Sequence, residues 1–181
     1  MKKLSLLLFF VQIVSYGQSF DFVPGVGIRN AQDHSKGFIV FDFPGMTADD
    51  IRAAVLSKIP AIYPSTGRVQ SGENNSVMLI ASTESPLFVL EPEHDHGSYK
   101  IGGDFTMYIY FKDGKVRYDS PSFQRLFMMH WNHSTYGNMQ DPIEVWINTN
   151  RKQISTAAYF SNLCRALNKA IEEAASKPSD W

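Results

Sequence analysis

The segment FTMYIYFKDGKVRYD, residues 105–119, decides the fold because it contains two alternating strands joined by Asp113-Gly114. An Asp-Gly pair in this setting favours a type I′ hairpin turn, in which both central residues take a positive φ. If these two residues form the loop, the turn sets the register of the hairpin. The expected opposite pairs are Phe111 with Val116, Tyr110 with Arg117, Ile109 with Tyr118 and Tyr108 with Asp119.

Side chains alternate between the two faces of a strand, so this register separates a core face from an opposite face. The core face is expected to hold Phe105, Met107, Ile109, Phe111, Val116 and Tyr118. The opposite face carries the candidate ligand-binding residues Thr106, Tyr108, Tyr110, Arg117 and Asp119. Tyrosine offers a flat amphipathic ring, and arginine offers a planar cation that binds a carboxylate or stacks on a ring. The alternative interpretation is that such cross-strand pairs only stabilise an exposed sheet.

Upstream of the hairpin, the pattern predicts one strand, one helix and then further strands. Residues 37–43 are apolar and close with Pro44-Gly45, which is typical of a strand. Thr47 is a suitable N-cap for a helix over residues 48–59, and Pro60 and Pro64 are expected to prevent a longer one. Strands are predicted at residues 68–71, 76–82 and 87–91, with a turn at 72–75 and an exposed loop at 91–97.

Downstream, the spacing of apolar residues predicts a short helix over residues 120–130 and a strand over 143–148. A final helix is predicted from Ser155 to about Ser176, before Pro178. Its apolar stripe includes the only cysteine, Cys164, so we expect a small buried hydrophobe there rather than a nucleophile. The other members of the stripe are Phe160, Leu163, Leu167 and Ile171.

The run 38–43, the helix opening 47–50 and above all the hairpin segment 111–118 resemble an exported bacterial domain family of unknown function. The resemblance covers about residues 37–123 and, more loosely, the final helix. It implies an α+β, TATA-binding-protein-like fold, in which an antiparallel sheet of about five strands carries an N-terminal helix and a long C-terminal helix on one face. Pro60 and an insert at 127–151 depart from the family pattern. The resemblance implies no activity and no DNA binding.

The N-terminus has the layout of a secretory signal peptide. Lys2 and Lys3 precede an apolar run from Leu4 to Val14, and small residues precede a cleavage point after Gly17. We therefore expect a signal peptide at 1–17, an irregular leader at 18–36 and a single α+β domain at 37–181. An exported chain, periplasmic or secreted and without stable membrane insertion after cleavage, is the expected product.

Composition argues against a nucleic-acid partner, because 17 basic and 18 acidic residues leave a formal charge of −1. Recognised hydrolase, phosphate-loop and Cys-x-x-Cys motifs are absent from the sequence, so we predict no catalytic residues and no cofactor. Two histidine pairs could supply Zn or Cu ligands if their loops meet, although polar surface loops are the simpler interpretation. These residues are His94, His96, His130 and His133.

The sequence therefore favours a non-enzymatic exported domain that binds an envelope protein or a small ligand on its open sheet face. One alternative is a metal-binding protein or metal-dependent enzyme that uses the four histidines. Another is a structural component of an envelope assembly. If the last helix or the insert at 127–151 covers Arg117, the first hypothesis loses its site. The metal content of the purified protein tests the second hypothesis, and co-purification of a fixed partner tests the third.

Overall fold

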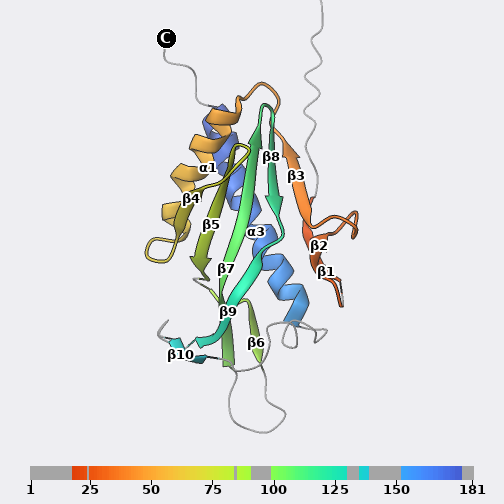
Figure 1. The fold of residues 1–181 in the computed structure, drawn as a ribbon, viewed down its shortest axis with the longest axis vertical. Helices are drawn as coiled ribbons and strands as arrows, with labels where there is room; N and C mark the ends of the chain where they lie inside the picture. The colour runs from red at the N-terminus through yellow and green to blue at the C-terminus, as the bar shows by residue number, and fades with distance from the viewer. Residues whose placement is uncertain are drawn as a thin grey trace, which may run out of the picture.

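A long central strand, β7 (Tyr99–Lys112), organises the fold (Figure 1). The structure is a computed structural model that describes residues 18–23, 25–83, 85–90, 99–129, 135–138 and 152–176. On one edge, β7 pairs with β5 (Ser76–Ser82) and β6 (Phe88–Leu90). On the other edge, it pairs with β8 (Lys115–Asp119) and β9 (Ser122–Met129). The two halves of β7 pair with different strands, so β7 connects the strands at one end of the sheet to those at the other.

Three further strands extend this antiparallel sheet, which has eight strands among the described residues rather than about five. Strand β3 (Phe38–Asp42) pairs with β8, and β4 (Arg68–Ser71) pairs with β5. Strand β10 (Thr135–Asn138) pairs with β9. The strands predicted at 37–43, 68–71 and 76–82 are therefore present, whereas the strand predicted at 143–148 and the loop at 91–97 lie outside the described residues.

The β7–β8 hairpin has the predicted two-residue loop and register, but its turn is not type I′. Tyr110 pairs with Arg117 and Phe111 with Val116, as expected. Gly114 has a φ of 70°, whereas Asp113 is not among the residues with positive φ. The turn is also bonded to the start of α1 and to the residues before it: Gly114 N–H donates to the Met46 carbonyl at 2.9 Å, and the Asp113 carboxylate accepts from Ala48 N–H at 2.9 Å.

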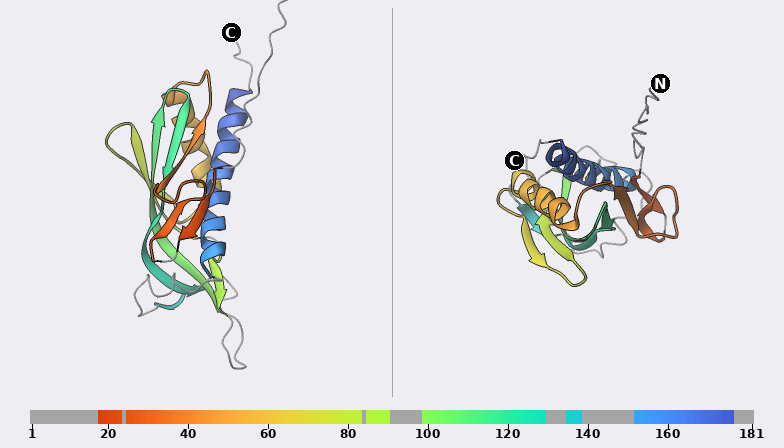
Figure 2. Two further views of the ribbon diagram at one scale, coloured as in Figure 1. Left: turned by 90° about the vertical axis from the view of Figure 1, so that its right-hand side faces the viewer. Right: turned by 90° about the horizontal axis from the view of Figure 1, so that it is seen from above.

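Helices α1 (Ala48–Ile62) and α3 (Lys152–Ala175) lie side by side and cover one face of the sheet (Figure 2). The six residues predicted for the core face of the hairpin are all buried there. The apolar stripe of α3 is also buried, and Phe160 packs edge-on against Phe105 with ring centroids 4.9 Å apart. The α+β fold class with both helices on one face is confirmed. Within the described residues, no helix is long and apolar enough to span a membrane.

Helix α1 continues through Pro60, which the sequence analysis placed beyond its end. Proline removes a single N–H donor from the helical ladder and disturbs the preceding turn. The helix closes soon afterwards, where Tyr63 N–H donates to the Ile59 carbonyl at 2.8 Å. One proline so near the C-terminus therefore does not prevent the last turn.

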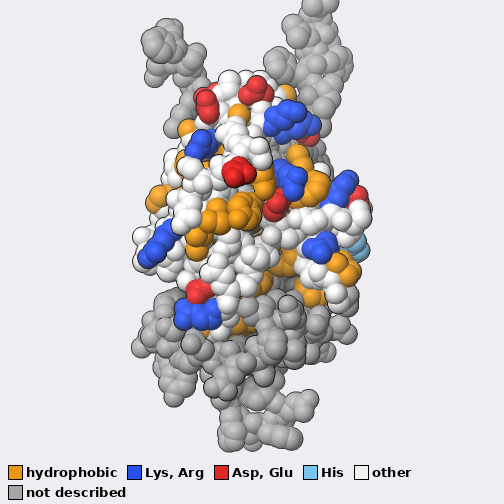
Figure 3. Space-filling model, in the orientation of Figure 1, with side chains coloured by type: hydrophobic (Ala, Val, Ile, Leu, Met, Phe, Trp, Pro, Cys, Tyr) orange, Lys and Arg blue, Asp and Glu red, His pale blue; other side chains and the backbone are white. Residues whose placement is uncertain are grey.

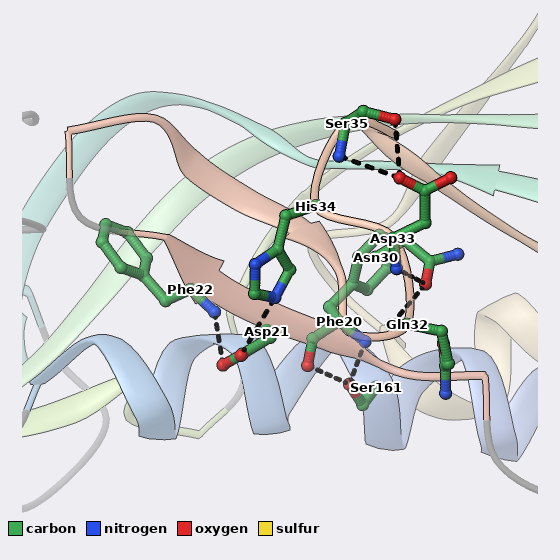
Figure 4. A network of polar contacts seen from close by, with 9 residues as sticks. All are labelled: Phe20, Asp21, Phe22, Asn30, Gln32, Asp33, His34, Ser35 and Ser161. Carbon is green, nitrogen blue, oxygen red and sulfur yellow. Dashed lines mark hydrogen bonds and ion pairs between the residues drawn. The ribbon is translucent and has the colours of Figure 1, made fainter.

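The segment 18–36 is not the irregular leader that we expected. It forms a hairpin of β1 (Phe20–Val23) and β2 (Gly27–Asn30) that packs against α3. Phe20 N–H donates to Ser161 Oγ on α3 at 2.9 Å, and the His34 ring lies 3.5 Å from the Asp21 carboxylate (Figure 4). Phe20, Phe22 and Ile28 are buried, so this hairpin belongs to the core. Its strands are short and contain glycine and charged residues, which weakens their hydrophobic pattern.

The helix predicted over residues 120–130 is wrong, because this segment forms β9. Its pairing with β7 shifts register between Asp104 and Phe105, where Arg125 and then Phe123 are the partners. As a result, Phe123 and Leu126, three residues apart, both pack against the core. A spacing of three is typical of a helix, so the irregularity in the pairing gives this strand a helix-like apolar pattern.

Candidate functional site

The candidate site is the outer face of the sheet, which we define as the face turned away from α1 and α3. In the view of Figure 3, hydrophobic side chains gather near the middle of this face, with charged groups around them. The strands place the predicted residues on it through the β7–β8 register. Its described members include Phe38, Val40, Met78, Ile80, Thr106, Tyr108, Tyr110, Arg117 and Asp119.

Arg117 lies between two aromatic rings on this face. Its guanidinium carbon is 4.0 Å from the centroid of the Phe38 ring and 5.0 Å from that of Tyr110. Its Nε donates to Asp119 Oδ1 at 2.6 Å, and the side chain keeps 42% of its accessible area. Stacking and the carboxylate together fix the plane of the guanidinium. Arg117 is therefore a preorganised, half-exposed cation.

Tyr108 and Tyr110 form the aromatic part of the site. Their ring centroids are 6.4 Å apart and the ring planes are tilted by 31°. Tyr108 keeps 41% of its accessible area, whereas Tyr110 is half-buried beside Arg117. Each ring has an apolar face and a hydroxyl that can form hydrogen bonds. The pair can therefore bind both apolar and polar groups.

Thr106 lies on the outer face but is not available for binding. Only 7% of its surface is accessible, and its hydroxyl accepts a hydrogen bond from Gln124 Nε2 at 2.7 Å. The pairing of β5 and β9 on either side of β7 places longer side chains over this small residue. The accessible site therefore begins at Tyr108 and runs toward Arg117.

A hollow of about 570 Å³ adjoins the two tyrosines, and no sequence pattern predicted it. Its far wall is the turn between β4 and β5, which brings Glu73 and Asn74 over the outer face. The residue types at 72–75 predict a turn but do not indicate that it lies next to Tyr108. The turn comes close to Tyr108 because β5 pairs with β7, with Ser76 opposite Tyr110 and Met78 opposite Tyr108.

The conformation of this turn is fixed by its own hydrogen bonds. Asn74 and Asn75 have φ values of 55° and 54°, a region that asparagine tolerates better than most residues. Asn75 Nδ2 donates to the Phe111 carbonyl at 3.2 Å, and Phe111 N–H donates to the Asn75 carbonyl at 3.0 Å. Ser76 Oγ also donates to the Glu73 carbonyl at 2.6 Å. The wall of the hollow is therefore anchored to β7.

The four histidines proposed as metal ligands, His94, His96, His130 and His133, lie outside the described residues. Within the described ranges, no cluster of three or more histidine, cysteine, aspartate or glutamate side chains could hold a metal ion. Cys164 is buried on α3, and burial raises the pKa of its thiol well above the ordinary value. A thiol in this setting stays protonated and is a poor nucleophile.

The fold is similar to that of a TATA-binding-protein-like (TBP-like) protein from Parabacteroides distasonis ATCC 8503, with a TM-score of 0.50 and 13% sequence identity. The match covers 75% of this chain and 90% of that protein. A DUF4468 family protein from Bacteroides ovatus ATCC 8483 matches over 80% of this chain and 87% of its own, with 10% identity and a TM-score of 0.44. No protein-family model and no curated protein match the sequence. The chain has a TBP-like fold, as the sequence resemblance implied.

Proposed function

We propose that this protein is an exported, non-enzymatic binding module that uses the outer face of its sheet. The observation that carries the proposal is the aromatic surface formed by the exposed Tyr108 and the half-buried Tyr110 beside the stacked Arg117. Tyrosine and arginine are enriched at the residues that contribute most to binding energy in protein interfaces. The Arg117 side chain is held by Asp119 and by the Phe38 and Tyr110 rings before a partner arrives, so it loses little conformational entropy on binding.

The same face also offers contrasting chemistry over a short distance. Arg117 and Asp119 supply a paired cation and anion, while Phe38 and Met78 supply apolar surface. Polar groups give an interface its specificity, and apolar anchors contribute most of its affinity. This mixture fits a partner with both kinds of group better than it fits a purely ionic ligand. The proximity of charged, aromatic and apolar groups on one accessible face supports a binding role.

The proposal is tested by combining Tyr110→Ala with Arg117→Ala and measuring recovery of envelope proteins on the immobilised mature chain. We expect the double variant to stay folded, because both side chains retain partial exposure. We also expect it to lose the partner that the wild-type chain recovers. Circular dichroism and thermal unfolding establish that the variant has folded.

Arg165→Ala is the matched control, because it removes an arginine from α3 rather than from the outer face. Recovery by this variant should equal that of the wild type. Equal recovery by the double variant would show that the partner binds elsewhere, and the proposal would then be rejected.

A further inference from the structure

We infer that the hollow between Tyr108 and the β4–β5 turn receives an arginine or lysine side chain from a protein partner. This inference rests on the proposed function and names the group that the site recognises. The hollow measures about 570 Å³ and is lined by Tyr108, Tyr110, Met78 and Glu73, among other residues. This volume accommodates a long side chain with apolar methylenes and a charged end.

The charge of the hollow favours a cation. Glu73 is exposed, and among the described residues its carboxylate takes part in no salt bridge. None of the described side chains that line the hollow is a lysine or an arginine. A guanidinium or ammonium group that enters the hollow would therefore meet an anion in the lining, while the nearest cation described on this face, Arg117, is already paired with Asp119 on the other side of Tyr110. Aromatic faces also attract cations through their quadrupole.

The molecule itself contains an example of this recognition on the same face. Arg117 already stacks its guanidinium against Phe38 and Tyr110 while its Nε bonds to Asp119. The lining of the hollow likewise includes tyrosine rings, Tyr108 and Tyr110, and an acidic residue, Glu73, but no arginine of the chain. The methylenes of an incoming side chain would pack against Met78, as long charged side chains do on apolar surfaces.

The anchored turn fixes the backbone of Glu73 at the edge of the hollow. The Glu73 carbonyl accepts from Ser76 Oγ at 2.6 Å, and Gly72 N–H donates to the Ser76 carbonyl at 2.9 Å. Asn75 then ties the turn to Phe111 of β7, next to Tyr110. Little ordering of the backbone is therefore needed when the cation binds, which favours affinity.

The test is an NMR titration of the isotope-labelled mature chain with a blocked Gly-Arg-Gly peptide and with its citrulline counterpart. Citrulline has nearly the same shape as arginine but no charge. We expect the arginine peptide to shift the resonances of Tyr108, Met78 and Glu73, and to bind more tightly than the citrulline peptide. Added salt should weaken the arginine complex, because salt screens exposed charges.

Substitutions in the hollow make the test specific. Glu73→Gln should weaken binding of the arginine peptide about two- to fivefold, the range expected for an exposed ion pair. Tyr108→Ala should weaken it by a similar factor through loss of the aromatic face, whereas Tyr108→Phe should keep the affinity. Glu172→Gln removes an equal charge from α3 and should have no effect.

Equal affinity for the arginine and citrulline peptides would overturn the inference, as would an unchanged affinity in Glu73→Gln. This failure differs from failure of the proposed function. If the variant with Tyr110→Ala and Arg117→Ala still loses its partner while the peptides are not distinguished, the outer face binds a partner through other chemistry. If the partner is retained by that variant, the proposed function itself is rejected.

Discussion

Tyr118 shows how one residue can link the sheet to the helices. Its ring packs against Phe41, and its hydroxyl donates to Asn168 Oδ1 of α3 at 2.8 Å. Both side chains are buried. A buried hydroxyl needs a partner, and here the partner comes from an element 50 residues further along the chain. The hairpin register predicted that Tyr118 is buried, but nothing in the sequence indicated Asn168.

Tyr118→Phe should lower the free energy of unfolding by about 1–3 kcal/mol, because it leaves the buried Asn168 carbonyl without its donor. Chemical denaturation of the two proteins measures the difference. Tyr108→Phe removes a hydroxyl from an exposed ring and should change the stability by less than about 0.5 kcal/mol. An equal small effect for both variants would show that the Tyr118–Asn168 bond contributes little.

The same residue predicts how stability depends on alkaline pH. Burial, with a smaller contribution from the nearby Cys164, raises the pKa of Tyr118 well above its ordinary value of 10.0. A group with a raised folded-state pKa contributes full stability below the unfolded-state pKa and loses this contribution as pH rises above it. Above about pH 10, the stability of the wild type should therefore fall more steeply than that of Tyr118→Phe. Parallel curves would contradict the assignment.

At the scale of the element, the N-terminus of α1 is stabilised both by a local N-cap and by a hydrogen bond to a distant part of the chain. Thr47 and Asp50 form a capping box, in which Asp50 N–H donates to Thr47 Oγ1 at 3.2 Å. The sequence predicted this cap from spacing alone. It did not predict that Asp113, in the β7–β8 turn, also accepts from Ala48 N–H. The start of the helix is therefore held by a hairpin that follows it by more than sixty residues.

Thr47→Ala should lower the free energy of unfolding by about 1 kcal/mol, since the N-cap side chain satisfies a free backbone donor. Thr47→Ser keeps the hydroxyl and should restore most of this loss. Thermal or urea denaturation of the three proteins provides the measurement. If alanine and serine at this position gave the same stability, the cap would have no energetic role.

Helices and strands could be predicted where their conformation follows from a local sequence pattern. The predictions failed where the conformation depends on a neighbouring strand or loop. The hairpin register, the start of α1 and the stripe of α3 follow from turn residues, capping and periodicity. Strand β9 was mistaken for a helix because a register shift in its pairing with β7 places Phe123 and Leu126, three residues apart, against the same core. The turn at Asp113 is not type I′, and it makes hydrogen bonds to Met46 and Ala48 that no local pattern indicates.

At the scale of the whole molecule, the fold buries one face of the sheet under the helices and leaves residues on the opposite face accessible. Helices α1 and α3 cover one face of the sheet, and the β1–β2 hairpin packs on α3 beside them (Figure 2). The outer face keeps the tyrosines, Arg117 and the hollow near Glu73. The sequence predicted most of the residues on this face through strand alternation. It could not predict the hollow, because Glu73 and Tyr108 come together only when β4 and β5 join the sheet.

The central claim is that the outer face is the surface that meets a partner. It is tested most directly by placing a photoreactive amino acid at position 108 of the chain expressed in its host and irradiating the cells. The same amino acid at position 169, on α3, serves as the reference. We predict a discrete crosslinked protein from position 108 and none of that size from position 169. Crosslinking from position 169 alone would contradict the claim and move the binding surface to the helical side.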